Sequence, residues 1–289
     1  MLTGAARSAA SRVVLRPTLQ TRNMATLREI ELRLKSVRNI EKITKSMKMI
    51  ASTKLAKAQR AMANAKNYGL ASNEVFKNVD APGGDRKLFV VISSDRGLCG
   101  GIHSSVTKAT RRLLDEGNED ARIVVLGDKS KSQLTRLLPN NLLLTFNQVG
   151  KDVPTFADAC VVANFITKSN AEFDSVHIVY NEFVSAISYQ AAAMKVVNQT
   201  ALQEAPNFKQ YEMEDDVTED LTEFSIANAV YAALVEGHAA EISSRRNAMD
   251  NASKNAGEMI TSLQMKYNRG RQAAITNELV DIITGASAL

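Results

Sequence analysis

The stretch that decides the fold runs from Leu27 to Ile50 and reads LREIELRLKSVRNIEKITKSMKMI. Its apolar residues recur mostly at steps of three and four, which is the spacing of one face of an α-helix. No proline interrupts the chain between Thr26 and Asn78, and Gly69 is the one glycine there. We therefore predict one long helix within residues 25–79, and such a helix must pack against another element to be stable in water.

The apolar positions of this helix should form a single coiled-coil seam. The seam residues that we expect are Leu27, Ile30, Leu34, Val37, Ile40, Ile43, Met47, Ile50, Ala58, Met62 and Ala65. The consecutive three-residue steps after Leu34 suggest a stammer, a local change in the winding of the coil. Basic residues occupy the other positions and include Lys35, Arg38, Lys42, Lys45 and Lys48.

A second proline-free stretch runs from Phe224 to Leu289 and predicts a matching helix within residues 224–289. Alanine, serine and glycine recur along it from Ala229 to Gly257, and small residues let two helix backbones approach closely. The partner that we expect is the first helix, running antiparallel. The final turns, from Ile275 onward, are apolar on more than one side, so a partner should enclose them.

The middle of the chain, residues 80–223, alternates strand and helix patterns. Strands are expected at Leu88–Ser94, Arg122–Leu126, Leu142–Phe146, Val176–Tyr180 and, at an edge, Ala191–Gln199; helices are expected near His103–Leu114, Lys131–Leu137 and Phe156–Ser169. This alternation predicts a Rossmann-like α/β domain with a mostly parallel sheet in three layers. The acidic run Glu212–Glu223 is interpreted as a loop that returns to the last helix. The fold class is thus α/β with long terminal helices: an antiparallel two-helix coiled coil with an inserted α/β domain.

Charge is distributed unevenly along the chain. Residues 1–24 contain four arginines and no acidic residue, and their Arg-, Ser- and Ala-rich composition is typical of a mitochondrial transit peptide. Between Leu27 and Asn78 there are 12 basic and 4 acidic residues, a net charge of +8. Two cysteines, Cys99 and Cys160, give neither a disulfide framework nor a metal-binding spacing. No apolar run is long enough to predict a transmembrane span.

Candidate catalytic and binding groups are few. The segment Ser93–Gly101, SSDRGLCGG, follows a strand and precedes a helix, a place where backbone amides can hold a phosphate. Its spacing matches neither the dinucleotide fingerprint nor the phosphate loop. The three histidines are scattered, and Cys99 lies in no recognisable nucleophile motif. We predict no catalytic residue, no cofactor and no metal; a metal site in the acidic run remains a weak alternative.

Four segments resemble the gamma subunit family of rotary ATP synthases, in the same order along the chain. They are IEKITKSMKMIASTKL from Ile40, SSDRGLCGG from Ser93, RRNAMDNAS from Arg245 and ITNELVDIITGA from Ile275. The resemblance implies a non-catalytic central-stalk rotor with a left-handed coiled coil inside a hexamer of alpha and beta subunits. It also implies contacts of the inserted domain with the delta and epsilon stalk subunits and the proteolipid c-ring, peripheral to the mitochondrial inner membrane on the matrix side.

By the same resemblance, certain residues are candidate partner contacts. Those expected to touch the hexamer are Met47, Lys48, Arg245, Arg271, Gln272, Thr276 and Glu278. A basic band formed by Lys42, Lys45, Lys48, Arg245 and Arg246 is expected to face acidic loops of the beta subunits. Those expected at the foot near the ring are Asp95, Arg96, Gly97, Gly100 and Gly101.

Two other classes of protein remain open from the residues alone. The +8 first helix suggests a nucleic-acid-binding coiled coil, which would bind DNA with a steep salt dependence. The low aromatic content, 5%, and the near-neutral charge of the chain without residues 1–24 argue against it. An enzyme built on the inserted sheet would need ligand residues at the strand ends, which the sequence does not reveal.

Overall fold

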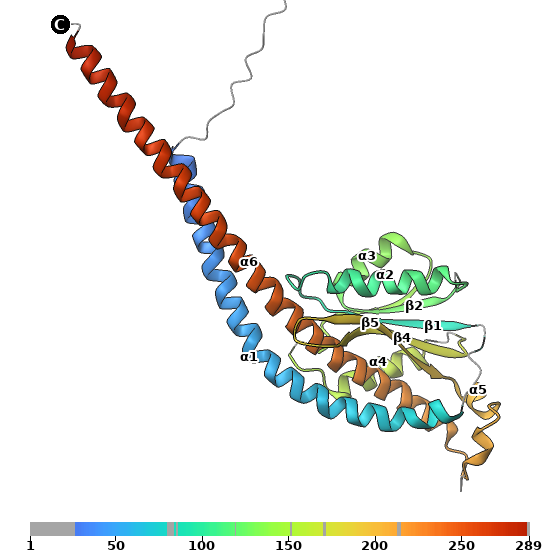
Figure 1. The fold of residues 1–289 in the computed structure, drawn as a ribbon. Coiled ribbons are helices and arrows are strands. Elements are labelled where there is room, and N and C mark those ends of the chain that lie inside the picture. The colour runs from blue at the N-terminus through green and yellow to red at the C-terminus, as the bar shows by residue number, and fades with distance from the viewer. Residues whose placement is uncertain are drawn as a thin grey trace, which may run out of the picture. The chain divides into compact units, whose positions relative to one another are not determined.

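The computed structural model describes residues 27–79, 84, 86–118, 120–150, 152–169, 172–212 and 215–287. The expected leader, residues 1–24, lies outside them. The helices are α1 (Leu27–Val79), α2 (Ile102–Asp115), α3 (Asp128–Leu137), α4 (Phe156–Thr167), α5 (Gln199–Gln203) and α6 (Thr218–Ser287), with the 3-10 turn η1 at Phe208–Gln210. The strands are β1 (Lys87–Ile92), β2 (Arg122–Leu126), β3 (Leu142–Phe146), β4 (Ser175–Phe183) and β5 (Tyr189–Val197). The predicted fold class is confirmed, with both long helices and the mostly parallel sheet present (Figure 1).

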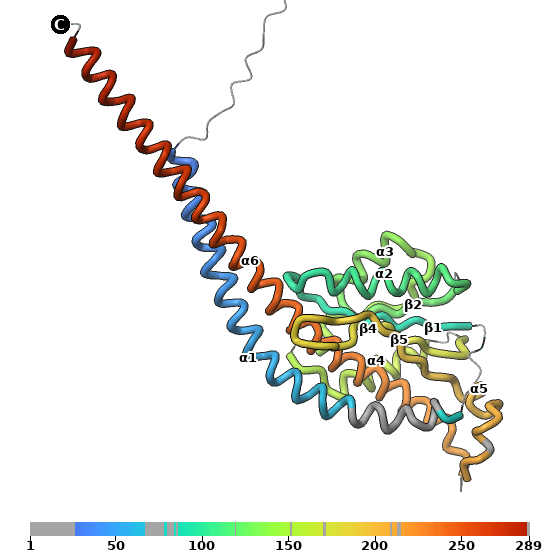
Figure 2. The backbone as a smooth tube through the Cα atoms, in the orientation of Figure 1, coloured from blue at the N-terminus to red at the C-terminus, as the bar shows by residue number. Residues whose placement is uncertain are grey.

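The chain forms two compact units. One comprises residues 37–259 and the other comprises the chain ends, of which residues 27–36 and 260–287 are described. Figure 2 traces the backbone through both.

The five strands of the larger unit form one sheet in the order β3-β2-β1-β4-β5. The first four strands in this order are parallel, and β5 pairs antiparallel with β4 at the edge. The expected edge strand is therefore confirmed. From β1 the chain continues to β2 and β3 on one side of the sheet and then crosses to β4 and β5 on the other side. The strand order therefore reverses between β1 and β4, which is the switch point of a doubly wound sheet.

Alternate residues of the central strands face opposite layers, as the pleat requires. Phe89 and Val91 of β1 pack with Val106 of α2 and Leu134 of α3 on one face. On the other face, Val90 and Ile92 pack with residues of α4 and α6. This is the three-layer arrangement visible in Figure 1. Helix α4 begins with a capping box in which Thr155 and Asp158 satisfy each other's backbone amides.

The last helix begins at Thr218 and not at the expected Phe224, so the interpretation of residues 218–223 as loop was wrong. Asp216 accepts hydrogen bonds from the Thr218 amide at 3.2 Å and from its hydroxyl at 2.6 Å. Glu219 and Asp220 lie in the first turn, where the helix dipole favours negative charge. The acidic residues thus help to begin the helix.

Within residues 37–259, α1 and α6 run antiparallel. Lys48 pairs with Asp250 while Lys66, further along α1, reaches back to Glu236 on α6. The buried residues of α1 include Val37, Thr44, Ala51, Ala58 and Ala65, which recur every seven residues, and Ile242, Met249 and Ala256 do the same on α6. A seven-residue repeat is that of a left-handed coiled coil.

The expected seam was wrong in one part. Ile40, Ile43 and Ile50 are exposed, because each three-residue step falls about 60° short of a full helical turn and successive steps leave the buried face. The small residues of α6 also have a second partner that we did not expect. Ala229 and Ala233 pack into the sheet cluster, while Ala256 lies on the seven-residue repeat.

Candidate functional site: the strand-end loops and the paired helices

The loop after β1 is held at the carboxyl edge of the parallel strands. Asp95 Oδ1 accepts the amide of Asp128 at 2.9 Å, and its Oδ2 accepts the amide of Gln148 at 2.8 Å. These amides belong to the chain segments that follow β2 and β3, so one carboxylate connects the ends of three strands. Gly127 adopts a φ of 103°, and a Cβ there would lie 2.7 Å from the backbone nitrogen of Ser94.

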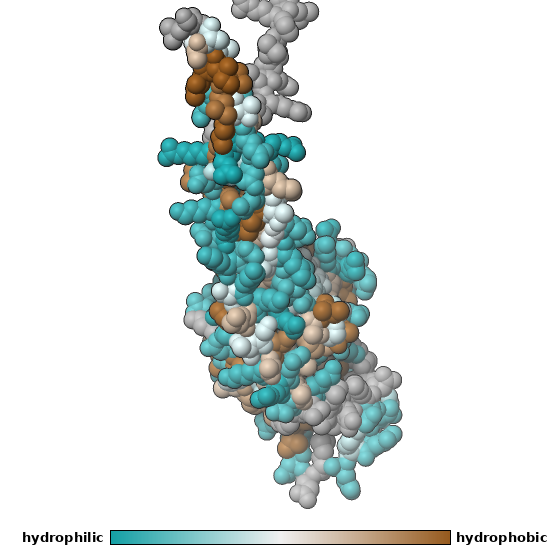
Figure 3. Space-filling view, turned by 60° about the vertical axis from the view of Figure 1, so that its left-hand side comes forward, coloured by the Kyte–Doolittle hydropathy of each residue, from teal (hydrophilic) through white to brown (hydrophobic). Residues whose placement is uncertain are grey.

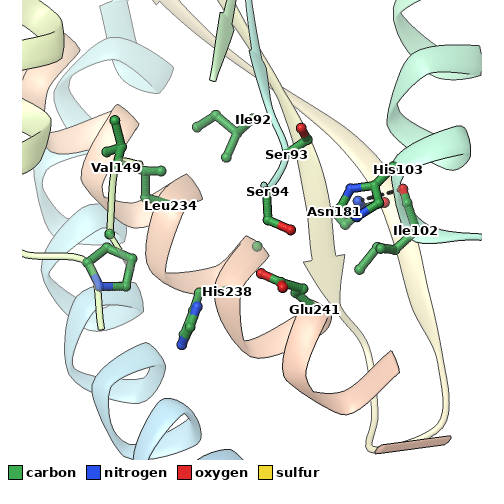
Figure 4. Close-up of a pocket in the computed structure, with 13 residues that line it drawn as sticks. Ile92, Ser93, Ser94, Ile102, His103, Val149, Asn181, Leu234, His238 and Glu241 are labelled. Atoms are coloured by element: carbon green, nitrogen blue, oxygen red, sulfur yellow. Dashed lines mark hydrogen bonds between the residues drawn. The ribbon is translucent and has the colours of Figure 1, made fainter. Parts of the chain in front are cut away.

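A small cavity lies at the switch point between β1 and β4 (Figure 4). Ser93 and Ser94 reach it from the end of β1, Asn181 from β4, and His238 and Glu241 from α6. Gly237 of α6 faces Ile92, and a Cβ there would make ordinary contact at 3.7 Å. The cavity measures about 40 Å³, which suits water and is far too small for a nucleotide. Helix α6 lines both this cavity and an adjoining hollow of about 240 Å³ at the same strand ends, where doubly wound folds usually bind a ligand.

Cys99 and His103 form the one close cysteine–histidine pair of the described residues. Cys99 Sγ lies 3.0 Å from His103 Nε2, which is also 3.1 Å from the Arg96 carbonyl. Burial raises the pKa of the Cys99 thiol to about 11, with Glu241 adding to the shift, and burial lowers the pKa of His103. A nucleophilic pair needs the opposite shift of the cysteine pKa, so this thiol stays protonated and packs as a small apolar group.

Other features of the described residues bear on the class of site. Across the described part of the chain, no three His, Cys, Asp or Glu side chains gather so as to hold a metal ion. None of the described helices is both long and apolar enough to cross a membrane.

The paired helices of the larger unit carry all five residues of the predicted basic band. Lys45 pairs with Glu41 at 2.7 Å, Lys48 pairs with Asp250 at 2.7 Å, and Arg245 pairs with Glu241. The pKa of Asp250 is lowered because Lys48 and Lys254 donate hydrogen bonds to it. Lys42 and Arg246 have no ion pair among the described residues. Much of the charge that the sequence assigns to this band is therefore neutralised within the chain.

Arg245 is a largely enclosed predicted contact residue, with a side chain only 11% exposed. Its guanidinium also donates to the Gly97 carbonyl at 3.5 Å, and the neighbouring Ser244 hydroxyl donates to the Cys99 carbonyl at 2.5 Å. The structure thus joins Arg245, expected at the hexamer, to the Asp95–Gly101 loop, expected at the foot. The two cannot be independent surfaces at opposite ends of the molecule.

Met47 and Lys48 are half-buried on α1 beside this region. In the smaller unit, Arg271, Gln272, Thr276 and Glu278 are all exposed, and the Thr276 hydroxyl donates to the Gln272 carbonyl at 2.9 Å. Leu27 lies against Gly270, which brings the two chain ends together. The same stretch of α6 exposes aliphatic side chains, visible as brown groups near the end of the helix in Figure 3: Ile275, Leu279, Val280, Ile282 and Ile283.

Sequence reasoning missed two buried acidic residues, Glu236 and Glu241. Glu236 accepts the Phe183 amide at 3.3 Å, lies 3.6 Å from Lys66, and has a pKa raised by burial. It connects α1, β4 and α6. An acidic residue directly after the largely apolar stretch from Ile226 to Val235 was the signal that could have identified Glu236.

Comparison with known proteins identifies the class to which this arrangement belongs. The family model described as ATP synthase matches residues 26–289. The "ATP synthase subunit gamma, mitochondrial" of Yarrowia lipolytica is 52% identical over 97% of this chain and 98% of its own length. The corresponding protein of Saccharomyces cerevisiae is 46% identical over 96% and 93%, and the "ATP synthase F(1) complex subunit gamma, mitochondrial" of Rattus norvegicus is 43% identical over 92% and 100%.

Solved structures agree. A chain of the Tetrahymena thermophila mitochondrial ATP synthase central stalk and c-ring is 30% identical, with a TM-score of 0.63 over 73% of this chain and 99% of that one. A chain of the Euglena gracilis enzyme, at 22% identity, shares the fold with a TM-score of 0.76 over 91% and 94%. The chain is thus a subunit of an enzyme complex, the ATP synthase. Within that complex it belongs to the family of mitochondrial gamma subunits.

Proposed function

We propose that this chain is the rotor of the central stalk, which turns inside a hexamer of alpha and beta subunits and couples proton flow through a membrane ring to ATP synthesis. The chain itself carries out no catalysis in this proposal. Its other partners are the delta and epsilon stalk subunits and the proteolipid c-ring, and it works on the matrix side of the mitochondrial inner membrane.

The observation that carries this proposal is the aliphatic surface on the last turns of α6. Ile282 and Ile283 are among the exposed residues, and a surface of this kind calls for a covering partner. Family membership supports a hexamer of head subunits as that partner. Rotation can change the conformation of the surrounding subunits only if the faces of the rotor differ from one another. A binding partner shifts a conformational equilibrium only by the difference in its affinity for the two conformations. Exposed Ile43 and Ile50 on one helix and exposed charges such as Lys42 provide that unevenness.

The domain division proposed with this function follows the sequence. Residues 1–24 are the transit peptide, 25–79 and 224–289 supply the two helices of the coiled coil, and 80–223 form the inserted domain. Helix α6 already begins at Thr218, and its residues from Ile226 to Leu234 also pack on the sheet of that domain. The seven proposed hexamer contacts are those given above, with Arg245 acting through its link to the Asp95–Gly101 loop. Mass spectrometry of the protein from mitochondria tests the leader, and an intact N-terminus would contradict it.

The first experiment on the function is co-purification. A tagged chain expressed in its own cells should bring down alpha and beta subunits in a complex that hydrolyses ATP. Recovery of the chain alone or with nucleic acid would contradict the proposal and favour the nucleic-acid-binding alternative, for which salt-sensitive DNA binding is the signature.

The second experiment tests coupling. Met47→Lys adds a charge at a half-buried position where, on this proposal, the acidic loops of the beta subunits approach. We expect fewer protons pumped per ATP hydrolysed in membrane vesicles. Val161→Lys, at an exposed position on α4, is the matched control and should leave the ratio unchanged. An unchanged ratio in Met47→Lys would count against the contact.

A further inference from the structure

Lys66 of α1 lies between two carboxylates that belong to different elements. Its Nζ is 3.6 Å from Glu182 Oε1 on β4 and 3.6 Å from Glu236 Oε1 on α6. Both distances exceed that of a short charge-assisted hydrogen bond, which is about 2.7–2.9 Å. The ammonium group is therefore shared, and a small movement of the lysine side chain would complete either pair.

The two carboxylates differ in their exposure to water. The Glu182 side chain is 41% exposed, whereas the Glu236 side chain is 8% exposed. Water stabilises the charge of Glu182, but the charge of Glu236 depends on groups of the protein. A proton taken up by this pair of acids should therefore reside on Glu236.

The groups that face Glu236 do not balance the charge of the cluster. From β4, the Phe183 amide donates to Glu236 Oε1 at 3.3 Å, and the Tyr180 hydroxyl donates to the same side chain. Among the described residues, the charged or titratable side chains that face it are Lys66 from α1 and Tyr180 and Glu182 from β4. With both acids ionised, the cluster has two negative charges and one positive charge. An excess negative charge at a mostly buried site favours the binding of a proton.

The pKa values in the cluster agree with this balance of charge. Burial raises the pKa of Glu236, with Glu182 adding to the shift, whereas Lys66 and the Phe183 amide oppose it. Burial also raises the pKa of Tyr180, with Glu236 and Glu182 adding to the shift, so the tyrosine keeps its proton. When Glu236 takes up a proton, Lys66 is left with one charged partner, Glu182 on β4.

We propose that Glu236 is a proton-binding site that decides which element holds Lys66 of α1. When Glu236 is ionised, Lys66 is shared between α6 and β4. When Glu236 binds a proton, Lys66 pairs with Glu182, and this lysine ties α1 to β4 alone. The proposal concerns contacts inside one chain, so it goes beyond the proposed function and does not rest on it.

The first test is the pH dependence of urea unfolding of the full chain. Glu236→Gln keeps the size of the side chain and an oxygen that can accept the Phe183 amide, but it removes the charge. Folding raises the pKa of Glu236, so the stability that its proton contributes is complete below about pH 4.5 and is lost as the pH rises through the folded-state pKa. The folding equilibrium constant of Glu236→Gln, divided by that of the wild type, should therefore rise several-fold between about pH 4.5 and pH 8.

This ratio isolates the proposed site, because groups that titrate equally in both proteins, such as the histidines, cancel. A glutamate with a purely structural role would give a ratio that does not change with pH. A constant ratio, or one that falls as the pH rises, would overturn the proposal.

The second test removes the competing acid. In Glu182→Gln, Lys66 should pair with Glu236 and favour its ionised form, so the ratio to the wild type should also rise with pH, by a smaller factor than for Glu236→Gln. The matched control is Asp152→Asn, because Asp152 is the exposed partner of Lys54 on the same helix and its pKa is lowered. Above about pH 5 its ratio should stay constant. A constant ratio in Glu182→Gln, or a rising ratio in Asp152→Asn, would contradict the sharing of Lys66.

Discussion

Between Ile226 and Leu234, α6 buries small and aliphatic residues against the sheet, whereas between Ile275 and Ile283 the same helix leaves its aliphatic residues exposed. The first stretch finds its apolar partners within its own chain. The second is helical without such cover, and isolated helices gain most of their stability from packing. The comparison shows that one helix serves two purposes: its first part completes a domain, and its last part supplies a surface for another molecule.

The largest difference should come from enlarging one alanine in the first stretch and one just before the second. Ala233 is fully buried in the sheet cluster, so Ala233→Leu should lower the free energy of unfolding by about 3 kcal/mol through overpacking. Ala273 is exposed, and Ala273→Leu should change it by less than about 0.5 kcal/mol. Urea unfolding of the purified chain measures both. Equal effects would remove the distinction between the two stretches.

Two glycines of the domain should respond differently to replacement by alanine. Gly127→Ala places a Cβ against the backbone of Ser94 at a positive φ and should cost about 2 kcal/mol. Gly237 lies in α6 with only ordinary contact to Ile92, so Gly237→Ala should be neutral or stabilise by up to about 1 kcal/mol. Urea unfolding of both variants measures the two changes in stability. A destabilised Gly237→Ala would mean that α6 lies closer to the sheet than described.

The pH dependence of unfolding should reside in the domain, since residues 260–287 contain no histidine. Burial lowers the pKa of His177 to about 4, with Lys87 and Lys195 adding to the shift. Between pH 6.5 and 4 the unfolded chain binds the extra proton, so stability that is complete above pH 6.5 is lost as the pH falls, by about 1–2 kcal/mol near pH 5. His177→Phe should flatten this part of the profile. An unaltered profile would assign the loss to other groups.

The smallest effect should come from the ion pair between the two helices. Lys48→Ala removes the partner of Asp250, but both side chains are partly exposed and Lys254 also bonds this carboxylate. We expect a loss of at most about 1 kcal/mol that shrinks further in high salt. Thermal unfolding at two salt concentrations measures it. A loss of several kcal/mol would show that the helices depend on this pair.

The sequence predicted the domain well where single strands are apolar throughout. The bounds of β2 and β3 matched the expectation because short apolar runs between turns have few alternatives. The sequence did not correctly predict the buried face of α1. Ile40, Ile43 and Ile50 are as apolar as the residues that are buried, and only their position in the helical repeat distinguishes the two groups. It also failed at Thr218, where acidic residues that suggest a loop instead begin a helix.

The candidate site was less predictable. The segment Ser93–Gly101 was found by its position between strand and helix, but its attachment to Arg245 depends on a contact between residues 148 positions apart in the chain. The hydrogen bonds of Ser243 and Asn247 to the Ala186 carbonyl, in the turn between β4 and β5, are likewise tertiary. Such bonds leave no periodic pattern, because serine and asparagine are equally common on exposed helix faces.

Asp95 illustrates a consequence of this kind of bonding. Each of its two oxygens receives an amide from a different crossover connection. Replacement by asparagine would preserve size and shape yet turn one acceptor into a donor, facing an amide that also donates. A change that looks conservative would then break the hydrogen bond to one crossover connection and keep the other. One connection would be released from the edge of the sheet while the core stayed intact.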